Sequence, residues 1–139
     1  MEEVYADTNI FVRLLSGDDQ PKYQACLQLF QRVKKGEVRL VTSAMIVAEV
    51  VYVLASKRQY GLGRDHIHRL LYPLLCLKEL KVPNRKAILR ALDYFVQYAN
   101  LDFEDCFIVA DTKQQNIARL YSYDQDFDGI DSVERVEPT

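Results

Sequence analysis

Short segments typical of β-strands alternate with longer segments of helical spacing, and this alternation constrains the fold more than any other feature of the sequence. The β-prone segments, which we predict as strands, are 3–6, 38–43, 79–83, 117–123 and 132–138. The segments with apolar residues at helical spacing, which we predict as helices, are 9–16, 19–35, 44–60, 64–77, 84–99 and 103–115. Strands that alternate with helices favour parallel pairing. We therefore expect the α/β fold class: a three-layer α/β/α sandwich with a central, mainly parallel sheet.

Polar residues that favour helix starts stand at several of these boundaries. Asp18 or Asp19, Ser43, Asn84 and Asp102 each precede a helical segment, where a side-chain oxygen can accept a hydrogen bond from the first backbone amides. We predict that each of these helices is capped there.

Length and composition indicate one domain over residues 1–139. No apolar run approaches the roughly 18 residues of a membrane span, so we expect a cytoplasmic protein that does not enter a membrane. The odd number of cysteines and their apolar surroundings predict buried free thiols rather than disulfides; these residues are Cys26, Cys76 and Cys106.

Two acidic residues follow predicted strands directly: Asp7 after the first and Asp124 after the fourth. Parallel sheets bind ligands at the carboxyl ends of their strands, so both acids are candidates for a site. Aspartate is also common where a strand turns into a loop, and Asp7 alone is equally explained as a helix N-cap.

Glu49 lies in the segment 45–54, which is apolar on almost every side. Such a helix is expected to be buried. A buried ionised carboxylate needs a cationic partner, and no Lys or Arg stands three or four residues away. A metal or catalytic role is therefore favoured over a distant salt bridge.

Asp105 follows Asp102 by three residues, so helix capping explains it nearly as well as catalysis does. Taken with Asp7, Glu49 and Asp124, it completes a set of four carboxylates that needs counter-charge if the acids converge. Oxygen ligands suit Mg²⁺ or Mn²⁺, and the absence of clustered His or Cys disfavours zinc. These ions most often act on phosphate esters.

Four blocks of sequence, in order, resemble those of PIN-domain ribonucleases and, within them, the VapC-type toxins of toxin–antitoxin pairs. The blocks are YADTNIFVRLL, SAMIVAEVVYVL, LDFEDCFIVA and LYSYDQDFDGI. The resemblance assigns Asp7, Glu49, Asp105 and Asp124 as catalytic residues and metal ligands. It also implies that Thr8, Asn9, Ser122 and Asp126 support the site. Ser122 stands where Thr is more usual in the family, and Cys106 where Ala is common, but neither change removes a ligand.

The resemblance implies an endoribonuclease that hydrolyses RNA phosphodiester bonds with Mg²⁺ or Mn²⁺ and leaves 5′-phosphate and 3′-hydroxyl ends. It further implies a homodimer and a cognate antitoxin partner. The net charge of −2 is unusual for a nucleic-acid enzyme. Basic residues gather between Lys57 and Arg90, where we expect either RNA contacts or an ordinary solvated surface. Most of the tyrosines are predicted to be core or dimer-contact residues rather than base-stacking platforms.

Three other protein classes are considered from the sequence. A haloacid-dehalogenase-type phosphotransferase needs a second aspartate two residues after the first, where this chain has Asn9. A receiver domain needs paired acids after the first strand, whereas Glu2 and Glu3 precede it. The strongest alternative is a non-catalytic PIN-like module that binds RNA or a protein.

Overall fold

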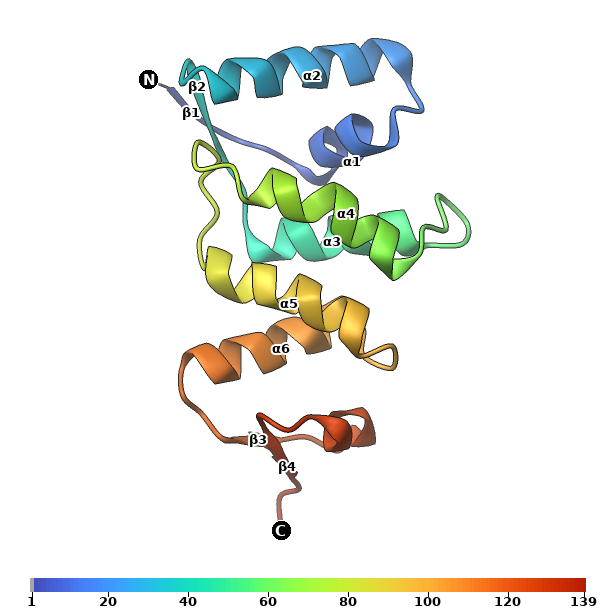
Figure 1. Cartoon of the computed structure of the whole chain (residues 1–139), viewed down its shortest axis with the longest axis vertical. Helices are drawn as coiled ribbons and strands as arrows, with labels where there is room; N and C mark the ends of the chain where they lie inside the picture. Colours follow the sequence, from blue (N-terminus) through green and yellow to red (C-terminus); the bar gives the residue numbers. More distant parts are fainter. Residues whose placement is uncertain (1) are drawn as a thin grey trace. The chain divides into compact units, whose positions relative to one another are not determined.

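The computed structural model describes residues 2–139, and the chain divides after Arg85 into two compact units, the second of which is Lys86–Thr139. Figure 1 shows the elements along the chain, and each unit is described by itself. The elements are β1 (Glu2–Tyr5), α1 (Thr8–Ser16), α2 (Gln20–Lys34), β2 (Val38–Val41), α3 (Ala44–Ala55), α4 (Arg64–Leu75), α5 (Arg85–Gln97), α6 (Phe103–Gln114), β3 (Arg119–Tyr121), the 3₁₀ helix η1 (Gln125–Gly129) and β4 (Glu134–Val136). Among residues 2–139, no helix combines the length and apolar character that a membrane crossing requires.

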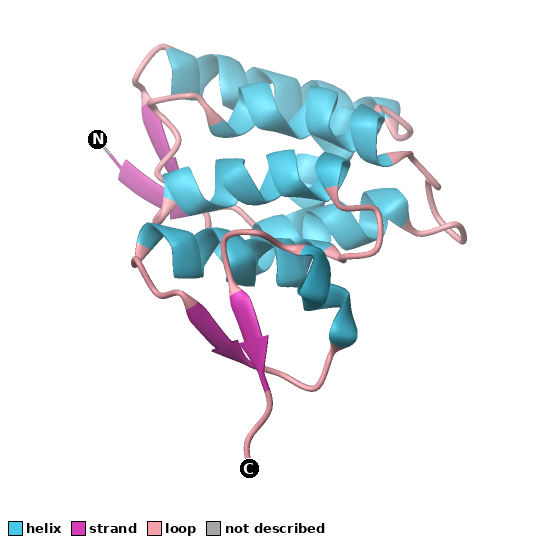
Figure 2. Ribbon diagram, turned by 60° about the horizontal axis from the view of Figure 1, so that its bottom comes forward, coloured by secondary structure: helices cyan, strands magenta, loops and turns pink. Residues whose placement is uncertain are grey.

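In the first unit, β1 and β2 pair in parallel, with Tyr5 opposite Val41. The strands of both units are the magenta arrows in Figure 2. The backbone amide of Ala6 continues the ladder by donating to the carbonyl of Val41 (2.9 Å). Both strands therefore end at one edge, where α1 begins soon after the first strand and α3 soon after the second.

The core of the first unit forms where α1 packs against α2 and α3. The rings of Phe11 and Phe30 meet edge to face, with 5.9 Å between their centroids. Leu40 of β2 and Leu54 of α3 are fully buried, as is Ile67 of α4. This packing fixes α1 and α3, which carry the first two candidate acids.

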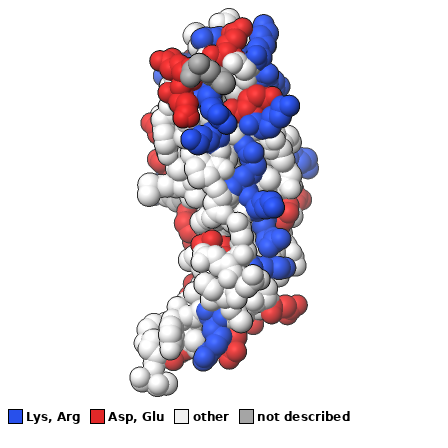
Figure 3. Space-filling view, turned by 90° about the vertical axis from the view of Figure 1, so that its left-hand side faces the viewer, with Lys and Arg blue, Asp and Glu red and all other residues white. Residues whose placement is uncertain are grey.

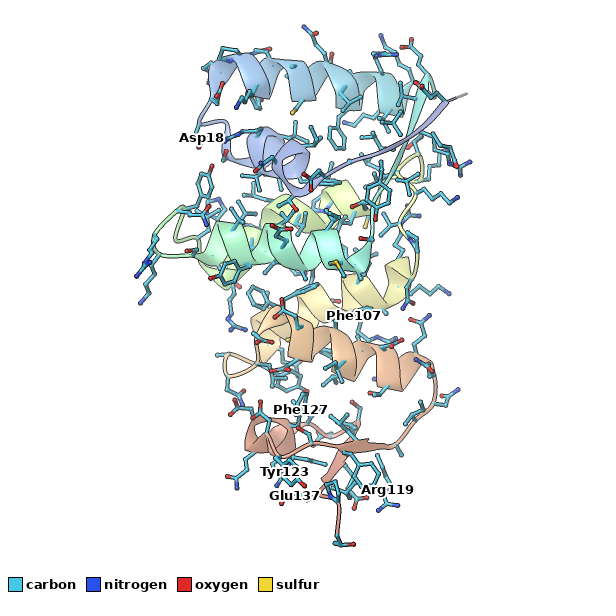
Figure 4. The ribbon with its side chains drawn as sticks, turned by 180° about the vertical axis from the view of Figure 1, so that it is seen from behind. Asp18, Phe107, Arg119, Tyr123, Phe127 and Glu137 are labelled. Atoms are coloured by element: carbon cyan, nitrogen blue, oxygen red, sulfur yellow. The ribbon has the colours of Figure 1, made fainter. Side chains whose placement is uncertain are left out.

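An exposed cluster of hydrogen bonds around Asp18, which we name the Asp18 clasp, joins the α1–α2 turn to the segment after α3 (Figure 4). Its carboxylate accepts hydrogen bonds from Tyr60 Oη (2.6 Å), Ser16 Oγ (2.8 Å) and Arg13 Nη1 (3.1 Å). The Tyr60 and Ser16 hydroxyls, with the Arg13 guanidinium, lower the pKa of Asp18 from 3.8 to about 2.

In the second unit, β3 and β4 also pair in parallel, with Arg119 opposite Glu134. Phe95 of α5 and Phe103 of α6 make an edge-to-face contact with 6.2 Å between ring centroids. Leu92 and Val109 are fully buried in the same unit. All strand pairs among residues 2–139 are thus parallel, as the alternation of strands and helices predicts.

Three local expectations are wrong. Segment 79–83 forms no strand, because only an isolated bridge joins Lys81 to Val41. Asn84 has left-handed backbone (φ 60°), which is not the extended conformation of an N-cap. The α3 helix ends at Ala55 rather than near residue 60, because the extended backbone of Ser56 (ψ 123°) terminates it.

Two of the three cysteines, Cys26 and Cys106, are buried as expected, and none of the three forms a disulfide. Cys76 is exposed, because it is the C-cap of α4 and follows the last buried turn of that helix.

Candidate functional site

Asp7 is the N-cap of α1, directly before the first residue of that helix. Its backbone is extended (φ −80°, ψ 168°), and its Oδ1 accepts a hydrogen bond from the amide of Thr8 (2.7 Å). The capping role weighed from the sequence is therefore real. The Asp7 side chain is nevertheless exposed, so it can also contact a cation or a water molecule.

Glu49 lies on the exposed side of α3, and the expectation that it is buried is wrong. The apolar residues of this helix are unequally covered: Val47, Val50, Val51 and Leu54 are buried, whereas Met45 and Tyr52 are exposed. Glu49 belongs to the exposed stripe, so burial does not force a cationic partner on it.

Thr8 connects the two acids of the first unit. Its side chain is only 5% exposed, and its Oγ1 donates a hydrogen bond to Glu49 Oε2 (2.8 Å) across 41 residues of sequence. Because Thr8 is also the residue that Asp7 caps, this hydroxyl holds Glu49 close to the start of α1. We refer to Asp7 and Glu49 as the first acidic pair.

Asn9, the other predicted supporting residue of this block, is exposed and lines a cavity of about 300 Å³ between α1 and α2. Arg13, Lys22 and the buried Cys26 line the same cavity. Arg13 is bound to Asp18 and Lys22 lies 3.9 Å from Asp19, so acidic neighbours already accompany both cations.

In the second unit, Asp102 caps α6 and its Oδ1 accepts the amide of Asp105 (2.9 Å). This contact brings the two carboxylates together at the helix start. Partial burial, the charge and hydrogen bonding of Asp102, and the charge of Asp124 raise the pKa of Asp105 from 3.8 to about 6. Several negative charges thus lie near Asp105 at the start of α6. We refer to Asp105 and Asp124 as the second acidic pair.

Asp124 follows β3 and is exposed, as expected for an acid after a parallel strand. Its amide donates to Ser122 Oγ (3.0 Å), and its Oδ1 accepts the amide of Asp126 (2.9 Å). Both predicted supporting residues therefore contact it. The carbonyl of Asp126 accepts a hydrogen bond from Asn100 Nδ2 (3.2 Å), which fixes the turn from outside.

Arg135 anchors the same turn from β4, and sequence reasoning missed it. Its Nη1 donates to the Ser122 carbonyl (3.0 Å), while Nε donates to Asp128 Oδ1 (2.7 Å) and Nη1 to Glu137 Oε2 (2.6 Å). The side chain is 12% exposed, and these carboxylates raise its pKa. Figure 4 labels Tyr123, Phe127 and Glu137 of the second unit. No local sequence pattern distinguishes Arg135 from other basic residues.

Asp102 was also missed as part of the acidic group, but the sequence contains a pattern that could have predicted its place there. A capping carboxylate accepts the amide of the residue three positions on, so an aspartate there brings two negative charges together. The sequence LDFED therefore predicts like-charge repulsion as well as a cap.

The donor atoms fit a hard divalent cation. The candidate acids are oxygen ligands, and burial together with the negative charges of Asp102 and Asp124 raises the pKa of Asp105 in the second unit. Across residues 2–139, no group of three His, Cys, Asp or Glu side chains is close enough to hold a metal by itself. Mg²⁺ is commonly held by one or two carboxylates together with water and substrate phosphates, whereas a structural zinc site needs four protein ligands.

Comparison with known proteins gives the family. The PIN domain family matches residues 4–133. A search of curated proteins finds no match. Among solved structures, the chain is similar to one described as "Crystal structure of VapBC2 from Rickettsia felis bound to a DNA fragment from their promoter". The identity is 18%, the TM-score is 0.37, and the alignment covers 99% of this chain and 98% of that one. The family match confirms the PIN-like α/β fold class, and the chain belongs to the PIN domain family.

Proposed function

We propose that this protein is a cytoplasmic, Mg²⁺- or Mn²⁺-dependent endoribonuclease that hydrolyses RNA phosphodiester bonds. Asp7, Glu49, Asp105 and Asp124 are its metal ligands and catalytic residues, within a single domain over residues 1–139. The observation that carries the proposal is the placement of the acids at helix starts in a chain of the PIN family: Thr8 holds Glu49 beside Asp7, and Asp102 accepts the amide of Asp105. A divalent cation bound there would offset the repulsion among these carboxylates.

The side chains around each pair act as supports. Thr8 orients Glu49, and Ser122 with Arg135 holds the turn that presents Asp124. A divalent cation supplies Lewis-acid chemistry, activating water and neutralising charge on the scissile phosphate. Because water rather than the RNA 2′-hydroxyl is then the nucleophile, the products are a 5′-phosphate and a 3′-hydroxyl.

Basic side chains available for the RNA backbone stand apart from the acids in sequence. Lys57, Arg58, Lys78, Lys86 and Arg90 are exposed. Figure 3 shows one face on which Lys and Arg lie beside one another with Asp and Glu interspersed. We propose that local basic clusters, rather than the net charge, hold the phosphates.

The four sequence blocks that resemble VapC-type toxins support a further part of the proposal: the protein is the toxin of a toxin–antitoxin pair and forms a homodimer. Co-expression with the product of the neighbouring gene, followed by co-purification and a growth assay, tests that part.

Cleavage of end-labelled RNA tests the activity. We expect Mg²⁺-dependent cleavage that EDTA abolishes, with 5′-phosphate and 3′-hydroxyl ends. Asp7→Asn is expected to be inactive. The matched control is Asp65→Asn, which neutralises an exposed acid in the first turn of α4 and should cleave normally.

A 2′,3′-cyclic phosphate product would contradict the mechanism. A metal-free protein that binds RNA without cleaving it would establish the non-catalytic binding module instead.

A further inference from the structure

The exposed stripe of α3 consists of Met45, Glu49 and Tyr52. Met45 is 81% exposed and Tyr52 is 69% exposed, although both are large and carry apolar surface. The three residues follow one another at spacings of four and three, so their side chains lie along one face of the helix. A proposed metal ligand thus stands between two large side chains that are open to solvent.

An exposed tyrosine can serve a protein interface or a nucleic acid. A protein partner packed on this stripe buries Glu49 with it, and a buried carboxylate without a paired cation is strongly unfavourable. Single-stranded nucleic acids instead use aromatic side chains as stacking platforms beside the groups that hold their backbone. The carboxylate in the middle of the stripe therefore favours RNA over a second copy of the chain.

We propose that Tyr52 is a base-stacking residue for single-stranded RNA, holding the base of a nucleotide whose phosphate lies at the metal ligand Glu49. Met45 packs against the same nucleotide or its neighbour from the other side of Glu49. This inference rests on the proposed nuclease function, because it uses Glu49 as a ligand. It assigns Tyr52 a positioning role in substrate binding and no part in the chemical step.

The helix geometry suits this role. Side chains three residues apart on a helix have Cβ atoms about 5–6 Å apart, a distance that one nucleotide spans between its phosphate and its base. Glu49 is itself held by Thr8, so the distance from ligand to ring is set by one rigid helix and one hydrogen bond. Glu49 repels phosphate in the absence of a cation, so stacking at Tyr52 should need a divalent ion.

Three substitutions separate stacking from general apolar contact in a cleavage assay with Mg²⁺ and a single-stranded oligoribonucleotide. Tyr52→Ala is expected to raise KM about 10-fold, because stacking on one aromatic ring contributes that order of affinity, while kcat changes little. Tyr52→Leu keeps apolar volume without the ring and should behave as Tyr52→Ala. Tyr52→Phe keeps the ring and should cleave as wild type.

A binding readout that does not depend on cleavage uses the absence of tryptophan from the chain. Tyr52→Trp gives a single reporter, and we expect oligo(A) with Ca²⁺ in place of Mg²⁺ to quench its fluorescence. EDTA should remove the quenching. The control is Ile117→Trp, an exposed position beyond the far end of α6 from Asp105, where oligo(A) should leave the emission unchanged.

Tyr52→Trp fluorescence that oligo(A) does not quench, or Tyr52→Ala with the KM of wild type, overturns the inference while leaving the nuclease proposal intact. Sedimentation that shows a dimer for wild type and a monomer for Tyr52→Ala also overturns it, since the stripe is then a protein interface. A wild-type protein that cleaves no RNA contradicts the proposed function, and the quenching of Tyr52→Trp still decides the binding role separately.

Discussion

The two acidic pairs of this protein are held in opposite ways. In the first unit, a buried neutral hydroxyl donates to Glu49, and Asp7 accepts a backbone amide, so each carboxylate faces a hydrogen-bond donor. In the second unit, Asp105 faces Asp102 and Asp124, and its pKa rises to about 6. The first pair is oriented by hydrogen bonds, whereas partial burial and neighbouring negative charges favour the neutral form of Asp105 in the second.

Under the proposed function, this difference predicts which pair depends more on metal. Hydrogen bonds to ionised carboxylates stabilise the charged form without any ligand. If the second pair holds a cation as proposed, binding that cation should offset the repulsion and stabilise the second unit. Replacing residues of each pair should therefore produce different combinations of lost activity and altered stability.

The largest effect is expected from Asp105→Asn. Cleavage should fall about 1,000-fold or more, because a ligand and its charge are lost. The metal-free protein should unfold at an equal or higher denaturant concentration, because one repelling charge is gone. Cleavage rates and urea unfolding in EDTA measure the two effects. Asp111→Asn on the same helix is the control, and a fully active Asp105→Asn would remove Asp105 from the site.

Thr8→Val should slow cleavage less than Asp105→Asn does, and it should lower stability rather than preserve or raise it. It keeps the shape of the side chain but removes the donor to Glu49. We therefore expect about 10-fold slower cleavage and a loss of about 1–2 kcal/mol in unfolding free energy. Thr8→Ser retains a hydroxyl and should restore most of both. Equal activity of the valine and serine variants would show that this hydrogen bond does not orient Glu49.

The pH dependence of stability should distinguish the pairs further. The folded-state pKa of Asp105 lies above its usual 3.8, so its contribution is fully present below that value and is lost as pH rises through about 6. Since the carboxyl is only partly buried, solvent screening reduces this contribution to about 1 kcal/mol. Urea unfolding in EDTA between these pH values should show the decline in wild type. The same decline in Asp105→Asn would assign it to other groups.

The smallest effect is expected away from both pairs. Tyr60→Phe removes the closest donor to Asp18, so the pKa of Asp18 should rise from about 2 toward 3.8. A lowered pKa stabilises the fold above the unfolded-state value, and that stability is lost as pH falls through about 2. Carboxyl NMR titration detects the shift. Cleavage should be unchanged, and a slower variant would connect this surface to the site.

Local chemistry made most helix starts predictable, although Asn84 does not cap α5. Ser43 and Asp102 cap α3 and α6 as expected, and of the two candidates before α2 it is Asp19 that caps. Capping depends on residues within one turn, so sequence alone contains the information. Segment 79–83 resembled a strand, but strand formation needs a partner ladder that no local pattern specifies.

The chemistry at Glu49 was harder to predict. An apolar helix was expected to bury its one acid, but burial depends on which side of the helix meets the core, and apolar residues on the remaining side left that choice open. Met45 and Tyr52 are apolar enough to resemble core positions, and only tertiary packing shows that they are not. Thr8 and Arg135 likewise act through partners distant in sequence. Thr8 binds Glu49, 41 residues away, and Arg135 binds Ser122, 13 residues away.

The Asp18 clasp has a consequence for folding kinetics. Its bond from Tyr60 joins residues 42 positions apart, with α2, β2 and α3 between them, and its groups remain at the surface. We expect such a contact to form after the intervening elements have packed and to contribute little to the folding transition state. Weakening it should therefore accelerate unfolding and leave the folding rate nearly unchanged. The Asp18 clasp would then prolong the lifetime of the folded first unit by slowing its unfolding.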